Sequence, residues 1–174
     1  MPRFCRTLAL MKRTLIDMEI SFKNAVFTDC EEIQRIQEKS FAALLEKYQD
    51  FDTNPATETL EKIQYKFNQD VTKYYFIMSE NVKIGVIRLV SIDETTMRIS
   101  PVMILPEYQN KGFAQKTFYE MEKKYPYIKV WQLDTIKQEE KLCYLYEKLG
   151  YTKTGREEDI KQGMTIIYYQ KVIK

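Results

Sequence analysis

The spacing of apolar residues along the chain predicts a central sheet. Apolar, β-branched and aromatic residues fill segments 74–78 and 84–92, and the polar stretch 79–81 between them is typical of a hairpin. Residues 97–105 predict a third strand after this hairpin. Pro101 lies inside that strand and has no N–H to donate, so we expect a bulge or an unpaired edge near it.

Other segments carry apolar residues at helical spacing. The longest predicted helix covers about residues 30–48, with Thr28 or Asp29 as its cap. The others are a shorter helix with Leu60, Ile63 and Phe67 on one face, a helix from Ala114 that ends before Pro126, and a helix that stops at Gly150. Further strands are expected at about residues 19–26, 128–133, 151–157 and 164–173.

This order of elements predicts one α/β domain, a mixed sheet with helices on its faces. No repeat or linker divides the chain, so we expect a single domain over residues 18–174. Residues 1–17 are basic in part, but their apolar run is too short for a signal-peptide core, and we interpret them as a leader of uncertain order.

Composition excludes several classes of chemistry. The 174 residues contain no histidine, which removes histidine-based triads and His-ligated metals. The three cysteines are far apart, which argues against a zinc site or a disulfide scaffold and favours the cytoplasm. The net charge is +2 with basic residues spread along the chain, and no apolar run is long enough to span a bilayer, so we expect neither a nucleic-acid nor a membrane partner.

The stretch PEYQNKGFAQ, residues 106–115, joins the strand at 97–105 to the start of a helix. Amide groups at a helix start have no acceptor within the helix, and the helix dipole adds positive character, so such a place favours a phosphate. Gly112 lets the backbone approach a ligand closely. A glycine before a helix is also common in plain turns, so this motif alone leaves both interpretations open.

Two segments together resemble a known family. The pattern Gln109-x-x-Gly112-x-Ala114 after an apolar strand resembles the Q/R-x-x-G-x-G/A motif of GCN5-related N-acetyltransferases (GNAT), and YLYEKLGY at 144–151 resembles the family's second segment. The resemblance implies a GNAT-like fold: a mostly antiparallel sheet of about seven strands, flanked by about four helices and splayed at the cofactor strand. It also implies acetyl transfer from acetyl-CoA to a primary amine, on a small molecule or a peptide, through a ternary complex.

The resemblance further implies where acetyl-CoA binds. The diphosphate would rest on backbone N–H groups of the loop and helix start, and the pantetheine arm would pair with the strand before the loop. The residues concerned are Asn110, Lys111, Gly112, Phe113, Ala114 and Gln115 for the diphosphate, and Val102, Met103 and Ile104 for the arm.

Tyr146 matches the family's usual general acid. A phenol with a pKa of about 10 can supply a proton to a departing thiolate, and the corresponding thiol has a pKa near that of cysteine, about 8.5. The alternative is that Tyr146 is a core residue on the buried stripe of its helix.

The general base is less defined. Many relatives carry a glutamate in the strand before the loop, but residues 97–105 contain none. Asp134, expected at the end of its strand, is the candidate base, although it could instead cap the next helix. Glu139 replaces an asparagine that contacts the cofactor in relatives. These departures keep a second function open, a catalytically weak acetyl-CoA-binding module that acts as a sensor or assembly partner.

The sequence leaves the acceptor and the assembly open. The acidic residues Asp50, Asp52 and Glu58 could attract a cationic acceptor or simply be solvated. A homodimer is one alternative for the oligomeric state.

Overall fold

The structure is a computed structural model that describes residues 19–174. The predicted leader at 1–17 lies outside the described residues. Seven strands form one sheet in the order β1-β2-β3-β4-β5-β7-β6, in which only the β4–β5 pair is parallel. The predicted α/β fold class is therefore confirmed.

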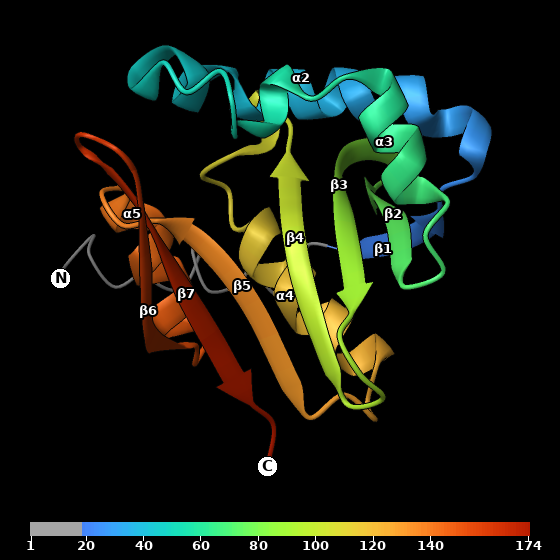
Figure 1. The fold of residues 1–174 in the computed structure, drawn as a ribbon. Helices are drawn as coiled ribbons and strands as arrows, with labels where there is room; N and C mark the ends of the chain where they lie inside the picture. Colours follow the sequence, from blue (N-terminus) through green and yellow to red (C-terminus); the bar gives the residue numbers. More distant parts are fainter. Residues whose placement is uncertain (1–18) are drawn as a thin grey trace, which may run out of the picture.

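The strands follow the predicted order, with small shifts of their ends. They are β1 (Ile20–Asn24), β2 (Thr72–Ser79), β3 (Val82–Ser91), β4 (Thr96–Ile104), β5 (Val130–Ile136), β6 (Thr152–Lys161) and β7 (Met164–Val172). The four α-helices of the described residues are α2 (Cys30–Tyr48), α3 (Leu60–Phe67), α4 (Phe113–Lys124) and α5 (Glu140–Lys148). As Figure 1 shows, α2 and α3 lie on one side of the sheet and α4 on the other.

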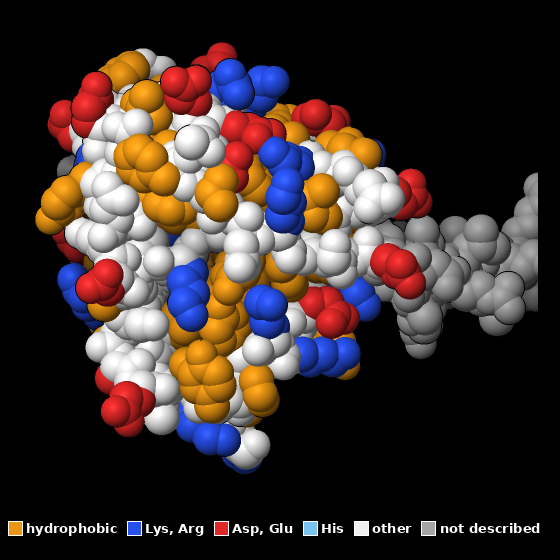
Figure 2. Space-filling model, turned by 90° about the vertical axis from the view of Figure 1, so that its right-hand side faces the viewer, with side chains coloured by type: hydrophobic (Ala, Val, Ile, Leu, Met, Phe, Trp, Pro, Cys, Tyr) orange, Lys and Arg blue, Asp and Glu red, His pale blue; other side chains and the backbone are white. Residues whose placement is uncertain are grey.

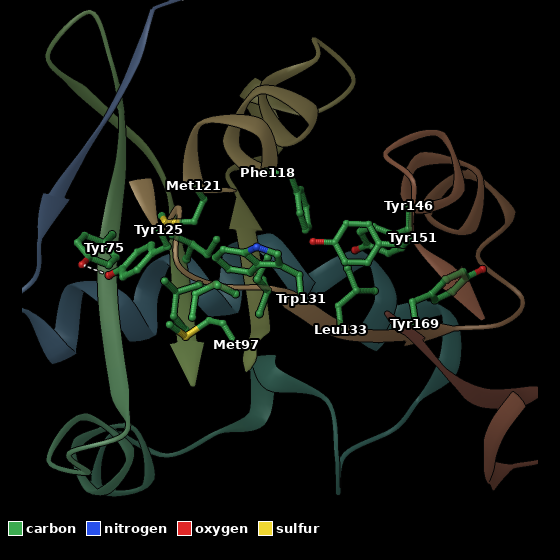
Figure 3. Packing of buried hydrophobic residues seen from close by; sticks show 14 of the residues in the cluster. Tyr75, Met97, Phe118, Met121, Tyr125, Trp131, Leu133, Tyr146, Tyr151 and Tyr169 are labelled. Carbon is green, nitrogen blue, oxygen red and sulfur yellow. Dashed lines mark hydrogen bonds between the residues drawn. The ribbon is translucent and has the colours of Figure 1, made fainter. Parts of the chain in front are cut away.

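The helices and the sheet enclose two hydrophobic clusters, one on each face. The larger contains the fully buried Trp131 of β5 and Phe118 of α4, with Tyr146 of α5 beside them (Figure 3). In the same cluster the hydroxyls of Tyr75 and Tyr125 share a 2.5 Å hydrogen bond. The smaller cluster joins α2 and α3 to the other face. Alternate residues of a central strand therefore face different clusters, as expected for a sheet covered on both sides.

The start of α2 differs from the predicted cap. Residues 27–29 form a 3₁₀ turn before the helix, and Asp29 occupies the cap position without a side-chain bond to the helix. Its carboxylate instead accepts a hydrogen bond from the Val26 N–H at 2.8 Å. The carboxylate thus closes the turn that leads into α2.

Gly85 allows close contact between β3 and β4. A Cβ atom at this position would lie much closer to the Met103 carbonyl oxygen than the van der Waals contact distance allows. We expect Gly85→Ala to lower the free energy of unfolding by about 1–3 kcal/mol, the usual cost of overpacking. Urea unfolding would measure this, and Gly155→Ala gives the cost of left-handed strain without overlap, since Gly155 has φ of 90° and no atom lies within 4 Å of a Cβ added there. Equal stability of Gly85→Ala and the unaltered protein would contradict the prediction.

Figure 2 shows the side of the molecule that carries α3 and the β1 edge. On this face lysine and arginine side chains are scattered among acidic and apolar ones. This face therefore lacks the continuous basic surface typical of nucleic-acid binding.

Candidate functional site

The sheet splits between β4 and β5. The two strands pair only over three residues each, ending at the pair Arg98–Gln132. Beyond it, β4 continues along β3 and β5 continues along β7, so segments 99–104 and 133–136 diverge (Figure 1). No strand of residues 19–174 fills the gap. The facing edges of β4 and β5 therefore offer backbone donors and acceptors to an extended ligand.

A bulge in β4 lies next to this split. Ile87 pairs with Val102 and Leu89 with Ile99, so one residue of β3 opposes two residues of β4, Ser100 and Pro101. The bulge predicted near Pro101 is confirmed. It re-aims the backbone of β4 at the point where the strand leaves β5.

The predicted pantetheine strand follows the bulge. Met103 and Ile104 are buried in opposite clusters, while Val102 is partly buried. Their side chains are therefore committed to packing. A ligand beside this part of β4 would meet the backbone on the β5 side.

The loop after β4 ends in a left-handed glycine. Residues 106–108 form a 3₁₀ turn, and Gly112, with φ of 88°, occupies the cap position of α4. Asn110 is also left-handed, with φ of 58°. Within the described residues, the backbone N–H groups of 110–115 donate to no protein acceptor, whereas the next amide, of Lys116, donates to the Gly112 carbonyl. These free N–H groups and the α4 dipole together suit an anionic ligand.

The Gln109 side chain ties this loop to β4. Its Nε2 donates to the Ile104 carbonyl oxygen at 2.7 Å, which fixes the loop against the strand end. The Tyr108 and Phe113 rings pack edge to face across the loop, with centroids 6.0 Å apart, and the Lys111 ammonium lies 5.9 Å from the Tyr108 ring centroid. The motif glutamine therefore has a structural role, which the sequence pattern alone did not specify.

Tyr146 lies in the larger cluster, on the inner face of α5. Its ring centroid is 5.6 Å from that of Phe118 and 6.0 Å from that of Tyr169. Burial, and secondarily the Asp134 carboxylate, raises the pKa of Tyr146 above its ordinary value. Within the described residues its hydroxyl has no hydrogen-bond partner. The phenol is thus protonated at neutral pH.

Asp134 lies within β5, because the strand continues to Ile136 and does not end at Leu133 as expected. Its Oδ1 lies 2.5 Å from the Arg98 Nη2, so an ion pair joins β5 to β4 at the base of the split. The structure also brings this carboxylate close enough to Tyr146 to affect its pKa. Because Leu133 packs in the same cluster as Tyr146, the side chain of the next residue, Asp134, leaves the opposite face of β5.

Glu139 links α5 to the end of α2. Its carboxylate accepts from the Lys47 ammonium at 2.5 Å and from the Tyr48 hydroxyl at 2.6 Å. Burial alone would raise the pKa of Glu139, but these hydrogen bonds outweigh it and hold the pKa below its ordinary value. Lys161 of β6 donates to the Gln49 carbonyl at 3.1 Å. The end of α2 therefore contacts both the start of α5 and the end of β6, an arrangement that the sequence pattern did not reveal.

Of the three acidic residues considered as attractors for a cation, Asp50 and Glu58 have local partners for their carboxylates. The Asp50 carboxylate accepts from the Thr53 N–H at 3.1 Å and from the hydroxyl of the same residue, and so closes its own turn. Glu58 forms ion pairs with Lys62 and Lys66. The lysines therefore neutralise Glu58, whereas Asp50 keeps its charge, and the Asp52 carboxylate forms no ion pair within residues 19–174.

Residues 19–174 lack two kinds of feature. No group of three or more potential metal-ligating side chains was found there. No helix in that part of the chain has the length and apolar character needed to cross a bilayer.

Comparison with known proteins agrees with this geometry. Residues 37–173 match the family model described as the acetyltransferase (GNAT) domain. A comparison with curated protein sequences gave no match.

Several solved structures share the fold. Spermidine N-acetyltransferase from Vibrio cholerae, solved with CoA and spermine, superposes with a TM-score of 0.69 at 16% identity, over 88% of this chain and 95% of that one. A ribosomal L7/L12 alpha-N-protein acetyltransferase in complex with coenzyme A gives 0.69 at 14% identity, over 88% and 94%. An acetyltransferase from Thermus thermophilus gives 0.68 at 11% identity, over 88% and 97%.

Proposed function

The chain belongs to the GNAT acetyltransferase family, and we propose that it transfers an acetyl group from acetyl-CoA to a primary amine within a ternary complex. The observation that carries the proposal is the junction of the β4–β5 split with the free amides before α4. One strand thus leads from an open sheet edge directly to an anion-binding helix start. Two of the similar structures, by their descriptions, contain CoA, which supports the same cofactor here.

In this proposal the residues of the loop hold the diphosphate of acetyl-CoA. The N–H groups of Asn110, Lys111, Gly112, Phe113, Ala114 and Gln115 would donate to its oxygens. Segment 102–104 would hold the pantetheine arm: the backbone groups of Val102 and the Ile104 N–H would pair with its amide groups, while the Met103 carbonyl faces Gly85 of β3 and the Ile104 carbonyl accepts from Gln109. This pairing orients the thioester toward the base of the split, where β4 and β5 meet.

The chemistry requires two proton transfers. The amine loses a proton, its nitrogen forms a bond to the thioester carbonyl carbon, and the carbon–sulfur bond breaks. The departing sulfur then takes up a proton. We assign that proton to the Tyr146 hydroxyl, whose raised pKa keeps the phenol protonated.

We keep Asp134 as the candidate base. Its carboxylate can accept the amine proton directly or through one water molecule. The ion pair with Arg98 engages Oδ1 and holds the carboxylate at the base of the split.

The proposal is tested by mixing the purified protein with acetyl-CoA and separate amines, and by measuring thiol release. The panel contains polyamines, amino acids, aminoglycosides and peptides with free N-termini. Thiol release with at least one amine, and formation of the matching N-acetyl product by mass spectrometry, is expected. No product with any class of amine would contradict it.

A second function is favoured by the absence of a glutamate from β4 and by the engagement of Glu139 with α2. In this alternative the chain binds acetyl-CoA without turnover and serves as a sensor or assembly partner. Calorimetry that shows tight acetyl-CoA binding, together with no acetyl transfer, would select it over the enzyme.

The cellular location remains a prediction. Cys30 and Cys143 are free thiols, which supports a reducing compartment such as the cytoplasm.

A further inference from the structure

Arg88 is a partly buried cation on the face of the sheet that carries α2 and α3. Its neighbours in β3, Ile87 and Leu89, belong to the cluster on the opposite face, so the Arg88 side chain extends toward the helices. Its guanidinium lies 6.0 Å from the Tyr74 ring centroid. One nitrogen, Nη1, donates to the Ser100 carbonyl oxygen at 2.9 Å.

The guanidinium of Arg88 lacks the partners that such a group normally has. Its Nε is buried and donates to no acceptor of the described residues. No carboxylate within residues 19–174 forms an ion pair with it. Burial lowers the pKa of Arg88 from its ordinary value, which reflects the cost of holding this charge away from water.

The neighbouring charges are already paired. Arg98 is held by Asp134, and Lys66 is held by Glu58. Arg88 is therefore the member of this group of cations whose charge is not neutralised by a carboxylate of the described chain. Buried charges in proteins are normally paired, and a buried N–H without an acceptor is costly. An anion supplied from outside would satisfy the first requirement, through the guanidinium nitrogens other than the buried Nε.

Arg88 is also close to the place where the reaction would occur. Its partner Ser100 begins the β4 bulge and follows Arg98, the last β4 residue that pairs with β5, by two positions. β3 and β4 are adjacent strands, and neighbouring strands lie about 4.8 Å apart. A ligand group held by Arg88 would thus lie about one strand away from the base of the split.

We infer that the acceptor of this chain is a small amino acid-type molecule, and that Arg88 binds its carboxylate while its amine faces the split. This inference rests on the proposed function and adds the class of acceptor to it. A guanidinium can bind a carboxylate through two parallel hydrogen bonds, and the Arg88 Nη2 together with the second N–H of Nη1 suits this geometry. The ion pairs of Glu58 with Lys62 and Lys66 argue in the same direction, against a polycationic acceptor at that carboxylate.

The test compares acceptors that differ only in the carboxylate. Each of a set of amino acids is assayed beside its own amide and the amine that remains when the carboxylate is removed, with spermidine as the polycation. We expect kcat/KM to be at least about tenfold higher for the acids, because a charge-assisted pair is lost in the other compounds. In Arg88→Gln this preference should disappear through a rise in KM for the acids, with the values for the amides unchanged. Arg88→Lys should restore part of the preference.

Arg35, which is exposed on α2, provides the matched control, and Arg35→Gln should keep the full preference. Thermal unfolding identifies any loss of fold in Arg88→Gln. If that variant does not fold, the preference for acids over amides is compared between Arg88→Lys and the unaltered protein, and it should be smaller in Arg88→Lys. Equal activity toward acids, amides and spermidine would overturn the inference while leaving the transferase function intact. So would an equal loss for acids and amides in Arg88→Gln.

If no amine releases thiol, the proposed function fails, and the inference is then decided by binding. The same acid and amide pairs are titrated by calorimetry into protein saturated with CoA. Acid-selective binding that Arg88→Gln removes would support the carboxylate site without turnover. Indistinguishable heats for acids and amides would overturn it.

Discussion

Gly112→Asp is expected to weaken acetyl-CoA binding by about tenfold to a hundredfold. Two effects add. The backbone at Gly112 is left-handed, with φ of 88°, and a side chain disfavours this conformation by about 1–2 kcal/mol, so the unliganded loop relaxes away from it and acetyl-CoA must restore it on binding. The new carboxylate also places a negative charge at the start of α4, where the diphosphate would bind, and reverses a favourable interaction of up to about 1 kcal/mol. Each 1.4 kcal/mol corresponds to about a tenfold change in the dissociation constant.

Calorimetric titration with acetyl-CoA measures this change. Gly163→Asp is the matched control, because Gly163 is also left-handed, with φ of 81°, and lies in the turn between β6 and β7. It introduces the same strain and the same charge away from the loop. Gly112→Ala separates the two effects, since it adds strain without charge. Unchanged affinity in Gly112→Asp would place the diphosphate elsewhere.

The sequence predicts the local part of this site well, because the relevant signals are local. The helical spacing of residues 30–48 corresponds to α2, and the strand–loop–helix order around Gly112 is as expected. Pro101 marks the bulge because a residue without an N–H cannot complete a ladder. In each case the physical constraint acts within a few residues of the chain.

The remaining features depend on contacts between distant segments. The Arg98–Asp134 ion pair joins residues 36 positions apart, and the hydrogen bond from Tyr48 to Glu139 joins residues 91 apart. Asp134 resembled a strand-end residue because the apolar run ends at Leu133, yet pairing with β7 extends β5 to Ile136. Such pairing depends on another strand, so the periodicity of β5 alone could not reveal it.

The unpaired guanidinium of Arg88 belongs to the same class of features. In the sequence it is one polar residue in an apolar strand, and its position predicts only the face on which it lies. Its significance comes from the ion pairs that neighbouring cations make with other residues. The charge left over in a cluster can be found only when the whole cluster is known.

Tyr146→Phe is expected to lower kcat by about a hundredfold, with the affinity for acetyl-CoA nearly unchanged. A positioned general acid typically contributes about 10²–10⁴-fold, and the lower end applies here because a thiolate is a good leaving group. The phenylalanine ring keeps the contacts with Phe118 and Tyr169, so packing is retained. Steady-state kinetics with the accepted amine, together with calorimetric titration of acetyl-CoA, separates turnover from binding.

The pH dependence of kcat gives a second readout. Because burial raises the pKa of Tyr146, the phenol should remain protonated up to at least about pH 10. At lower pH values, kcat of the unaltered enzyme should therefore show no decrease caused by loss of this proton. Tyr144 lies two residues earlier on α5 and is 68% exposed, so Tyr144→Phe is the matched control and should keep full activity. A Tyr146→Phe enzyme as active as the control would assign Tyr146 to the hydrophobic core alone, and the proton of the departing thiol would then come from solvent.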